Sequence, residues 1–295
     1  MILSILIPAV LITQTLASRG IVEDVRGSIA QKNFAQAERR IAEYRKQRGV
    51  TPEMLAALSW LSRGALAEKQ LDRAESYAQE TYQLTLAQLK GRKLDDDKLL
   101  PLALGAAIEV QAQVLAARGE RSAAVDFLTK ELATHRATSI RIRIQKNLHM
   151  LSLEGKPAPK LEGAPLPAGR PALLFFWAHW CPDCKMMAPA LARLKKEYAA
   201  KGLAIIAPTQ RYGYTRRGQD AAPAVEDEYI AALRKEHYAE ILDVPAPINE
   251  ENFRAYGAST TPTLVLIDAQ GIVRMYHPGE MTYAELEPRV RQLFR

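Results

Sequence analysis

Ala172-Leu-Leu-Phe-Phe-Trp-Ala178 is a continuous apolar run, and it leads directly into His179-Trp-Cys-Pro-Asp-Cys-Lys-Met-Met-Ala-Pro189. A short apolar run of this kind predicts a strand that is buried in a covered sheet. The stretch that follows, from Cys181 to about Ala200, is rich in helix-forming residues and predicts a helix. Two cysteines, Cys181 and Cys184, therefore stand where a buried strand ends and a helix begins.

The elements after this junction predict a layered α/β architecture. Residues 203–207 form a second apolar run, and residues 263–267 and 272–276 predict an antiparallel hairpin around the turn at 268–271. Helices are expected at residues 223–238, 249–256 and 282–294. This order of elements is typical of a three-layer α/β/α sandwich with a mixed central sheet.

The spacing of Cys181 and Cys184 predicts thiol–disulfide chemistry. A thiolate is the nucleophile in such exchange, and the unpaired N–H groups and positive dipole end of a helix start favour a negative sulfur at Cys181. Cys184 lies one turn later on the same face, close enough to form a small disulfide, and we expect it to be the more buried of the two. Cys181 is thus expected to attack a partner disulfide and Cys184 to resolve the mixed disulfide.

Two other interpretations of the cysteine pair remain open. One is a zinc site, but zinc is commonly held by four ligands, and the sequence has no second cysteine pair and no His-x₃₋₅-His. His179 alone does not complete a site, so we expect no metal. The other is a purely structural disulfide, which is unusual at a strand–helix junction.

The first half of the chain predicts helical hairpins. Residues 21–153 are rich in strong helix formers and contain only two prolines, Pro52 and Pro101. Three segments are alike in that a polar turn precedes a helix with a small alanine near its start; they are Asn33–Glu38, Gln70–Glu75 and Glu120–Val125. A small residue there lets two antiparallel helices approach closely. This pattern resembles a degenerate tetratricopeptide-like array of about three hairpins; the alternative is an irregular helical bundle. Either arrangement offers a face for a docking partner.

Five prolines lie between Gly155 and Pro171 and predict an extended linker that is poor in hydrogen bonds. The expected organisation is a signal peptide or short anchor at residues 1–18, a tetratricopeptide-like helical domain at 19–153, the linker at 154–171 and an α/β domain at 172–295. The domain boundary is placed near Leu153 to Lys160.

The N-terminus predicts export. Residues 2–16 are mostly apolar, and a run of about 11 apolar residues fits the core of a signal peptide better than the ~20 residues of a spanning helix. No Lys or Arg precedes the run, so a retained anchor and a buried terminal helix stay open as alternatives. After residue 17 we expect no segment long and apolar enough to span a bilayer. The expected location is periplasmic or otherwise extracytoplasmic, with tethering by this segment as the alternative.

The formal net charge of +7 lies mostly in the first half of the chain. Nucleic-acid binding usually needs a denser basic stripe or a recognisable motif. We therefore expect a solvated basic face and no nucleic-acid partner; the alternatives are an acidic partner and an anionic membrane surface.

Residues from about 160 to 295 resemble the thioredoxin superfamily. The resemblance rests on Trp180-Cys-Pro-Asp-Cys-Lys-Met-Met-Ala-Pro189, in which Pro189 matches a proline that kinks the active-site helix, and on Thr261-Pro262-Thr263, whose proline is cis in that family. Gly279 matches a glycine after the last strand. With an export signal and an insertion before Thr261, the chain looks like the periplasmic TlpA/ResA-type thiol–disulfide oxidoreductases. The implied site has Cys181 and Cys184 as catalytic residues, supported by Trp180, Pro182, Asp183, Thr261 and Pro262.

The sequence departs from that family at the position of the proton acceptor. Where thioredoxins carry a buried Asp, this chain has Phe175, and where ResA-type proteins carry a Glu, it has Met187. Asp183 is the nearest carboxylate in sequence. We hypothesise that Asp183 or water accepts the proton of the resolving thiol; the alternative is that Asp183 is a solvated helix-start residue of little effect.

The expected function is an exported protein-disulfide oxidoreductase that reduces disulfide-bearing client proteins. No glycine fingerprint of a dinucleotide cofactor is visible, so no cofactor is expected, and the resemblance implies that electrons arrive from a membrane thiol-transfer protein. The alternative is a repeat-based protein-interaction module or redox sensor with little turnover. The basic segment Arg211–Asp220 either helps to select a partner or is a solvated loop.

Overall fold

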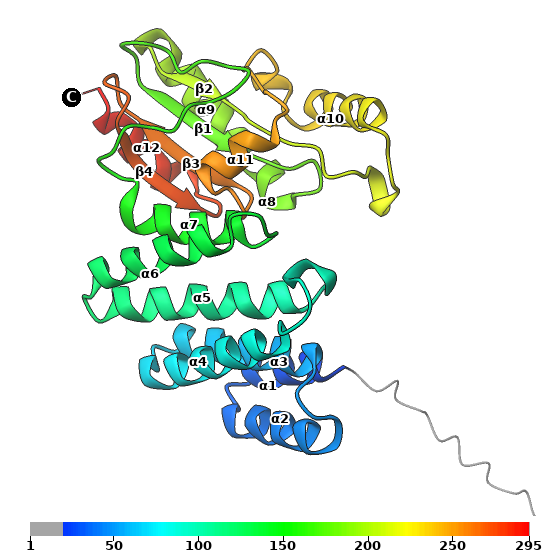
Figure 1. The fold of residues 1–295 in the computed structure, drawn as a ribbon. Coiled ribbons are helices and arrows are strands. Elements are labelled where there is room, and N and C mark those ends of the chain that lie inside the picture. The colour runs from blue at the N-terminus through cyan, green and yellow to red at the C-terminus, as the bar shows by residue number, and fades with distance from the viewer. Residues whose placement is uncertain (1–19, 295) are drawn as a thin grey trace, which may run out of the picture.

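The computed structural model describes residues 20–294. The predicted signal peptide or anchor lies outside the described residues. Figure 1 shows a helical part that leads, through its last helix, onto a part built around a β-sheet.

The helical part is an array of hairpins, as predicted. Its helices are α1 (Ile21–Ala30), α2 (Phe34–Arg48), α3 (Pro52–Ala67), α4 (Leu71–Gln88), α5 (Leu100–Ala117), α6 (Arg121–Thr134) and α7 (Arg141–Ser152), with a short 3₁₀ turn at Leu94–Asp96. Contacts follow chain order, α1 with α2, α3 with α4 and α5 with α6, while α1, α3 and α5 pack on one another in turn. The finer assignment to tetratricopeptide-like repeats remains a prediction.

The three similar sequence segments mark the starts of α2, α4 and α6. Asn33, Gln70 and Glu120 are the N-cap positions of these helices, and the Asn33 side chain accepts a hydrogen bond from the Gln36 N–H. The alanine four positions after each N-cap is completely buried; these are Ala37, Ala74 and Ala124. Small side chains at these points allow the close helix–helix approach that the sequence predicts.

Helix α5 corrects one sequence-based expectation. With a mean hydropathy of 1.5 over 18 residues, it is long and apolar enough to cross a membrane by length and composition, although nothing after residue 17 was expected to be. However, 56% of it is buried, and it contacts α3, α4, α6 and α7. Packing at the centre of the array accounts for its apolar composition.

The second part contains a four-stranded mixed sheet in the order β2-β1-β3-β4. Its strands are β1 (Ala172–Phe176), β2 (Ala204–Ile206), β3 (Thr263–Ile267) and β4 (Val273–Pro278). β1 is parallel to β2 and antiparallel to β3, and β3 is antiparallel to β4. The helices are α8 (Pro182–Met186), α9 (Ala188–Tyr198), α10 (Pro223–His237), α11 (Glu250–Tyr256) and α12 (Tyr283–Gln292).

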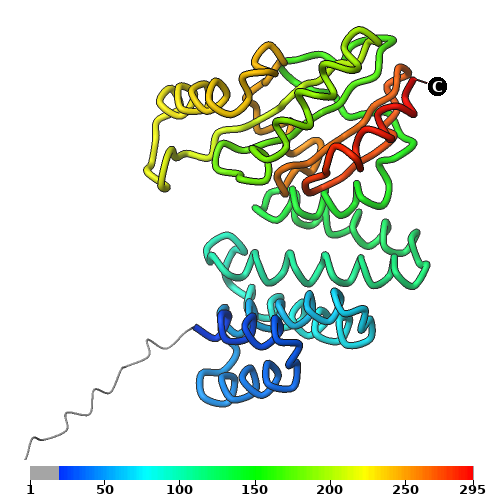
Figure 2. The backbone as a smooth tube through the Cα atoms, turned by 180° about the vertical axis from the view of Figure 1, so that it is seen from behind, coloured from blue at the N-terminus to red at the C-terminus, as the bar shows by residue number. Residues whose placement is uncertain are grey.

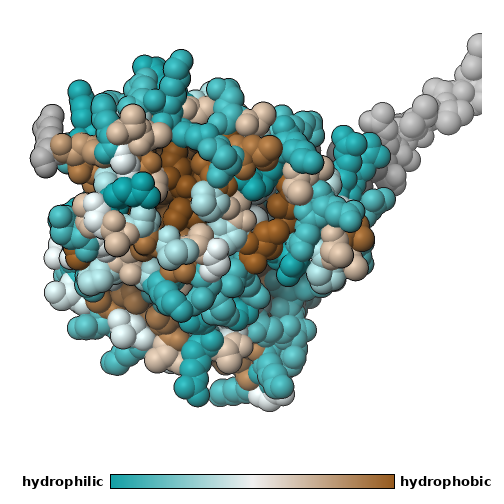
Figure 3. Space-filling model, turned by 90° about the horizontal axis from the view of Figure 1, so that it is seen from above, coloured by the Kyte–Doolittle hydropathy of each residue, from teal (hydrophilic) through white to brown (hydrophobic). Residues whose placement is uncertain are grey.

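Alternate residues of the strands point to two different cores. Leu173 and Phe175 pack with residues of α8, α9 and α12, whereas Leu174 and Phe176 pack with Phe253 and Tyr256 of α11. The sheet is therefore covered on both faces, which confirms the predicted three-layer sandwich. Figure 3 views the molecule from the sheet-containing end, where apolar side chains gather near the centre of the face among hydrophilic ones.

The predicted helix from Cys181 to about Ala200 is divided into two helices at the point where the family resemblance implied a kink. α8 ends at Met186 and α9 begins at Ala188, with Met187 between them and Pro189 in the first turn of α9. Proline has no N–H to donate and its ring clashes with the preceding turn, so the helix is interrupted there. The break confines the cysteine pair to a helix of one and a half turns.

The start of the Pro-rich linker, predicted to be extended and poor in hydrogen bonds, is hydrogen-bonded to the second part. The Gly155 N–H donates to the Val273 carbonyl, the Val273 N–H donates to the Lys156 carbonyl, and the Ala158 N–H donates to the Gly271 carbonyl, at 2.8–2.9 Å. The linker thus lies along the free edge of β4. Pro157 forms an isolated antiparallel bridge with Ile272, and the hydrogen bonds are made by its neighbours Lys156 and Ala158, so the missing N–H of proline is not needed.

Helix α7 joins the two parts, because it packs on both α5 and α6 and also contacts α11 and β4. Figures 1 and 2 both show it between the hairpins and the sheet. His149 of α7 is buried and its Nδ1 lies 3.0 Å from the Tyr256 carbonyl oxygen. The predicted boundary near Leu153 to Lys160 remains a proposal.

Candidate active site

Cys181 and Cys184 lie at the start of α8 and form a disulfide, with their Cα atoms 5.3 Å apart. Cys181 is the N-cap residue, and the backbone N–H of Cys184 donates to its Sγ at 3.1 Å. Pro182 occupies the first helical position, where a missing N–H costs nothing. A thiolate at Cys181 would accept the same hydrogen bond, which favours its charged form.

The segment before β3 lies against the sulfur of Cys181. The Thr261–Pro262 peptide bond is cis, in agreement with the family resemblance, and the Thr261 carbonyl oxygen lies 3.4 Å from Cys181 Sγ. The Gly279 N–H donates to the Pro262 carbonyl at 2.8 Å, which ties the end of β4 to the same place. The structure therefore brings the Thr261–Pro262 segment beside Cys181, whose neighbours in sequence are Trp180 and Pro182.

Burial does not separate the two cysteines in the way the sequence suggested. Cys181 is 1% exposed and Cys184 0%, so neither sulfur stands clear of its neighbours in the disulfide form. Pro182 and Asp183 between them are exposed, and so are two large apolar side chains beside them, Trp180 at 47% and Met186 at 62%. The surface around the buried sulfurs thus includes two large apolar side chains.

A groove of about 720 Å³ lies beside α8. Its walls come from α8 and α9 on one side and from the connection between β4 and α12 on the other, and they include Met186, Met187, Arg193, Met281 and Tyr283. Methionine side chains adapt their shape to irregular apolar surfaces. The groove thus combines adaptable apolar side chains with the charged residues Arg193, Glu280 and Glu285.

The positions of the usual proton acceptor are apolar in the structure as well. Phe175 is completely buried and Met187 is 2% exposed, and both belong to the core under the cysteines. Asp183 is exposed on α8. Whether Asp183 or water takes the proton of Cys184 stays a hypothesis.

The structure adds a buried contact between a histidine and a carboxylate that sequence reasoning missed. His179, 2% exposed, has its Nε2 3.1 Å from Oε1 of Glu226, which is completely buried on α10. Burial lowers the pKa of His179, while the hydrogen bond to Glu226 opposes that shift. The two residues are far apart in the sequence, and no spacing rule links them.

The two halves of the segment Arg211–Asp220 differ: the first half contacts other residues of the domain, and the second half is exposed to solvent. Tyr212 and Tyr214 contact His179, and Arg211 makes a two-pronged ion pair with Asp227 at 2.7 Å. Residues 216–220 are exposed. The solvated-loop interpretation thus holds only for the second half of the segment.

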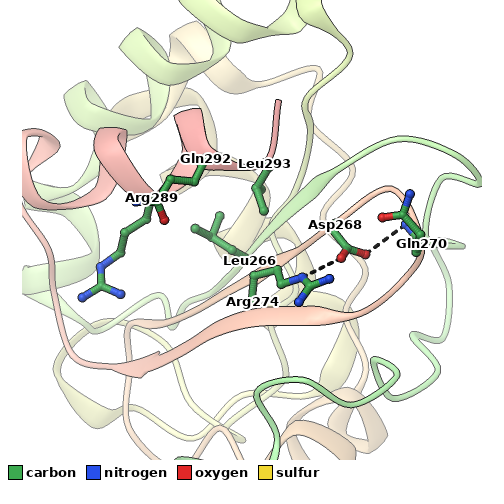
Figure 4. Close-up of a pocket in the computed structure, with 7 residues that line it drawn as sticks. All are labelled: Leu266, Asp268, Gln270, Arg274, Arg289, Gln292 and Leu293. Carbon is green, nitrogen blue, oxygen red and sulfur yellow. Dashed lines mark hydrogen bonds and ion pairs between the residues drawn. The ribbon is translucent and has the colours of Figure 1, made fainter. Parts of the chain in front are cut away.

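A smaller cavity of about 350 Å³ lies at the opposite end of β3 from the cysteines (Figure 4). Asp268 accepts hydrogen bonds there from Arg274 Nε and from the Gln270 N–H, and Arg289 points away from this pair. Because the Asp268 carboxylate is already bonded, the cavity offers no converging set of free groups. We do not assign it to the candidate active site.

Among residues 20–294, no group of three or more His, Cys, Asp or Glu side chains is arranged to hold a metal ion. The cysteine pair in the described part of the chain is engaged in the disulfide instead.

Residues 166–294 match the thioredoxin-like domain family. Thioredoxin-like protein YneN of Bacillus subtilis is 31% identical over 123 residues, which are 41% of this chain and 64% of that protein. Thiol-disulfide oxidoreductase ResA of Oceanobacillus iheyensis is 29% identical over 119 residues, 40% of this chain and 55% of that protein. The chain thus spans 55–64% of the length of these two relatives.

Among solved structures, a putative thiol:disulfide interchange protein DsbE from Chlorobium tepidum is 24% identical, with a TM-score of 0.37, over 48% of this chain and 98% of that one. The family match covers β1 to α12, the cysteine pair and the cis-proline segment. Residues 166–294 are therefore a thioredoxin-like domain, preceded in this chain by an array of helical hairpins.

Proposed function

We propose that this protein is a thiol–disulfide oxidoreductase that reduces disulfides of client proteins. The observation that carries the proposal is the position of Cys181: it caps α8, accepts the Cys184 N–H at 3.1 Å and lies 3.4 Å from the carbonyl before the cis-proline. The N-cap position stabilises the attacking thiolate, and the backbone beside the cis-proline suits an extended client segment.

The exchange has two steps. In the reduced protein, the Cys181 thiolate attacks one sulfur of a client disulfide, and the other client sulfur leaves as a thiolate. The Cys184 thiol then loses its proton and attacks Cys181 Sγ, which closes the Cys181–Cys184 disulfide and releases the second client thiolate. Two electrons pass to the client, whose thiolates take up two protons, and a dithiol reductant must restore the protein.

Trp180, Pro182, Asp183, Thr261 and Pro262 are the proposed supporting residues. Trp180 would contact the client, Pro182 starts α8, and Thr261 and Pro262 hold the carbonyl beside Cys181. The relatives are named as thiol-disulfide oxidoreductase and thiol:disulfide interchange proteins, which supports the same class of partner.

We further propose an extracytoplasmic location, with a membrane thiol-transfer protein as reductant and a protein partner on the helical hairpins. The apolar run at residues 2–16 supports export. Cell fractionation combined with N-terminal sequencing of the isolated protein tests this: recovery from the cytoplasm with an intact Met1 would contradict it.

Reduction of insulin disulfides by dithiothreitol tests the activity. Wild type should accelerate precipitation of insulin chains, and Cys181→Ser should abolish the acceleration. Cys184→Ser should retain attack but accumulate a covalent adduct on Cys181 that dithiothreitol releases. A wild-type protein that binds insulin without accelerating its reduction would instead favour the alternative, an interaction module or redox sensor with little turnover.

A further inference from the structure

Glu226 connects three segments of the chain at the edge of the candidate active site. Its Oε1 lies 3.1 Å from His179 Nε2 and 2.6 Å from the Tyr212 N–H, and its Oε2 accepts the Gly213 N–H at 2.9 Å. A completely buried carboxylate is costly to desolvate and is retained only where such donors surround it.

His179 is in turn enclosed by tyrosines. The rings of Tyr212, Tyr214 and Tyr229 meet it edge-on, with ring centroids 5.3–5.4 Å away. Tyr212 also meets Trp180 edge-on at 5.5 Å. The half-exposed Trp180 therefore rests against a segment whose backbone is fixed by Glu226.

Hydrogen bonds other than the His179–Glu226 contact also hold the connection from β1 to α8 in place. The Trp177 N–H donates to the Pro208 carbonyl, and Thr209 Oγ1 donates to the Trp177 carbonyl at 2.8 Å. Glu226 in turn accepts hydrogen bonds from the N–H groups of Tyr212 and Gly213, which lie outside this connection. Because the buried Glu226 carboxylate binds the backbone of Tyr212, it fixes the position of the Tyr212 ring beside Trp180.

We propose that His179 and Glu226 are positioning residues that hold residues 211–214 against Trp180 as one wall of the site that binds protein disulfides. This inference rests on the proposed function. Because Tyr212 lies beside Trp180 and not at the sulfur atoms, such a wall favours polypeptide clients, which extend beyond their disulfide. It acts on client binding, and the electron transfer itself belongs to Cys181 and Cys184.

The test is Glu226→Gln, with Glu228→Gln as the matched control on the same helix. Glutamine has one acceptor oxygen and a donor NH₂ group, so it cannot accept from both N–H groups and from His179 as the carboxylate does. Glu228 is exposed on α10. Its substitution should leave all measurements at the wild-type values.

Glu226→Gln should raise KM for insulin reduction about tenfold while kcat stays within about twofold, because binding is lost and the exchange step is kept. Hydrogen exchange of the Tyr212 and Gly213 amides should accelerate at least about tenfold over Glu228→Gln. A KM equal to that of the control overturns the inference, as does a fall in kcat at constant KM.

If Glu226→Gln does not unfold cooperatively, the variant is not folded like the wild type, and Tyr212→Ala tests the inference instead. This substitution removes the ring that contacts Trp180 and keeps both His179 and Glu226. It should show the same rise in KM, and an unchanged KM would overturn the inference. Failure of the wild-type protein to reduce insulin contradicts the proposed function, whereas an active wild type with an unaltered variant contradicts only the positioning role.

Discussion

Gly257 lies directly against the backbone of α7, so that a β-carbon built on it would stand 2.5 Å from the backbone nitrogen of Lys146. Gly257 also ends α11 with a φ of +63°, a conformation that side-chain-bearing residues rarely adopt. The close approach is possible only because glycine has no side chain. It brings the last helix of the array onto the helix that covers the sheet.

Gly257→Ala should therefore destabilise the protein by about 3 kcal/mol, from overpacking together with left-handed backbone strain. Gly271→Ala is the matched control: its φ is +80°, and a β-carbon added there would have nothing within 4 Å. The control should lose about 1 kcal/mol from strain alone. Urea unfolding measures both, and equal losses would contradict the close approach.

Stability should fall in acid because of His149. Burial lowers the pKa of His149, and the nearby Lys156 lowers it further, against a hydrogen bond to Tyr256 that raises it. Nδ1 must donate to the Tyr256 carbonyl, so Nε2 accepts from the Gln145 amide, and protonation of Nε2 breaks this contact. In the unfolded chain the pKa of His is about 6.5. The contribution of neutral His149 to the free energy of unfolding is therefore fully present above about pH 6.5, and it is lost as the pH falls below that value.

The measurement is urea unfolding at pH 7.5 and pH 5 for wild type and His149→Asn. The variant keeps a side-chain donor and does not titrate, so the difference between the two curves isolates this histidine. Wild type should lose about 1 kcal/mol more than the variant between the two pH values. Parallel curves would show that His149 does not contribute.

The buried alanines of the hairpins should resist enlargement. Ala74 is completely buried near the start of α4, so Ala74→Leu should cost about 2 kcal/mol through overpacking. Ala87 is exposed near the end of the same helix, and Ala87→Leu should change stability by less than about 0.5 kcal/mol. Thermal unfolding of the two variants checks this; similar melting temperatures would contradict the close helix contact.

Asp183 should slow the reaction of Cys181 with electrophiles. A carboxylate between the cysteines opposes the thiolate that the helix start favours. Asp183→Asn should thus speed alkylation of reduced Cys181 by iodoacetamide about twofold at pH 7. Asp126→Asn, an exposed change on α6, serves as the control. Unchanged alkylation and turnover in Asp183→Asn would end its proposed acid–base role.

The sequence was most informative where the cause of structure is local. Caps and turns act within a few residues, so Asn33, Gln70 and Glu120 were found at helix starts, and the strand–helix junction at Cys181 followed from one apolar run. The family resemblance implied a kink at Pro189, but the predicted helix limits still gave one continuous helix where the structure has two.

What the sequence did not reveal depends on tertiary contacts. The partner of His179 is Glu226, on a helix beyond the next strand, and only the fold brings the two side chains together. The linker residues 155–158 form hydrogen bonds with β4 and the residues just before it. Composition alone does not show that this edge of the sheet is free to pair. The packing of α7 on α11 depends on Gly257. In the sequence, this residue cannot be told apart from a glycine in an ordinary turn.

The reduction potential of the Cys181–Cys184 couple tests the central claim most directly. The protein is equilibrated in a series of dithiothreitol or glutathione buffers, and its redox state is read by thiol alkylation. A reductase of client disulfides, with a thiolate opposed by Asp183, should have a potential near about −270 mV or lower. A potential near about −120 mV would make the protein an oxidant of client thiols and would contradict the account.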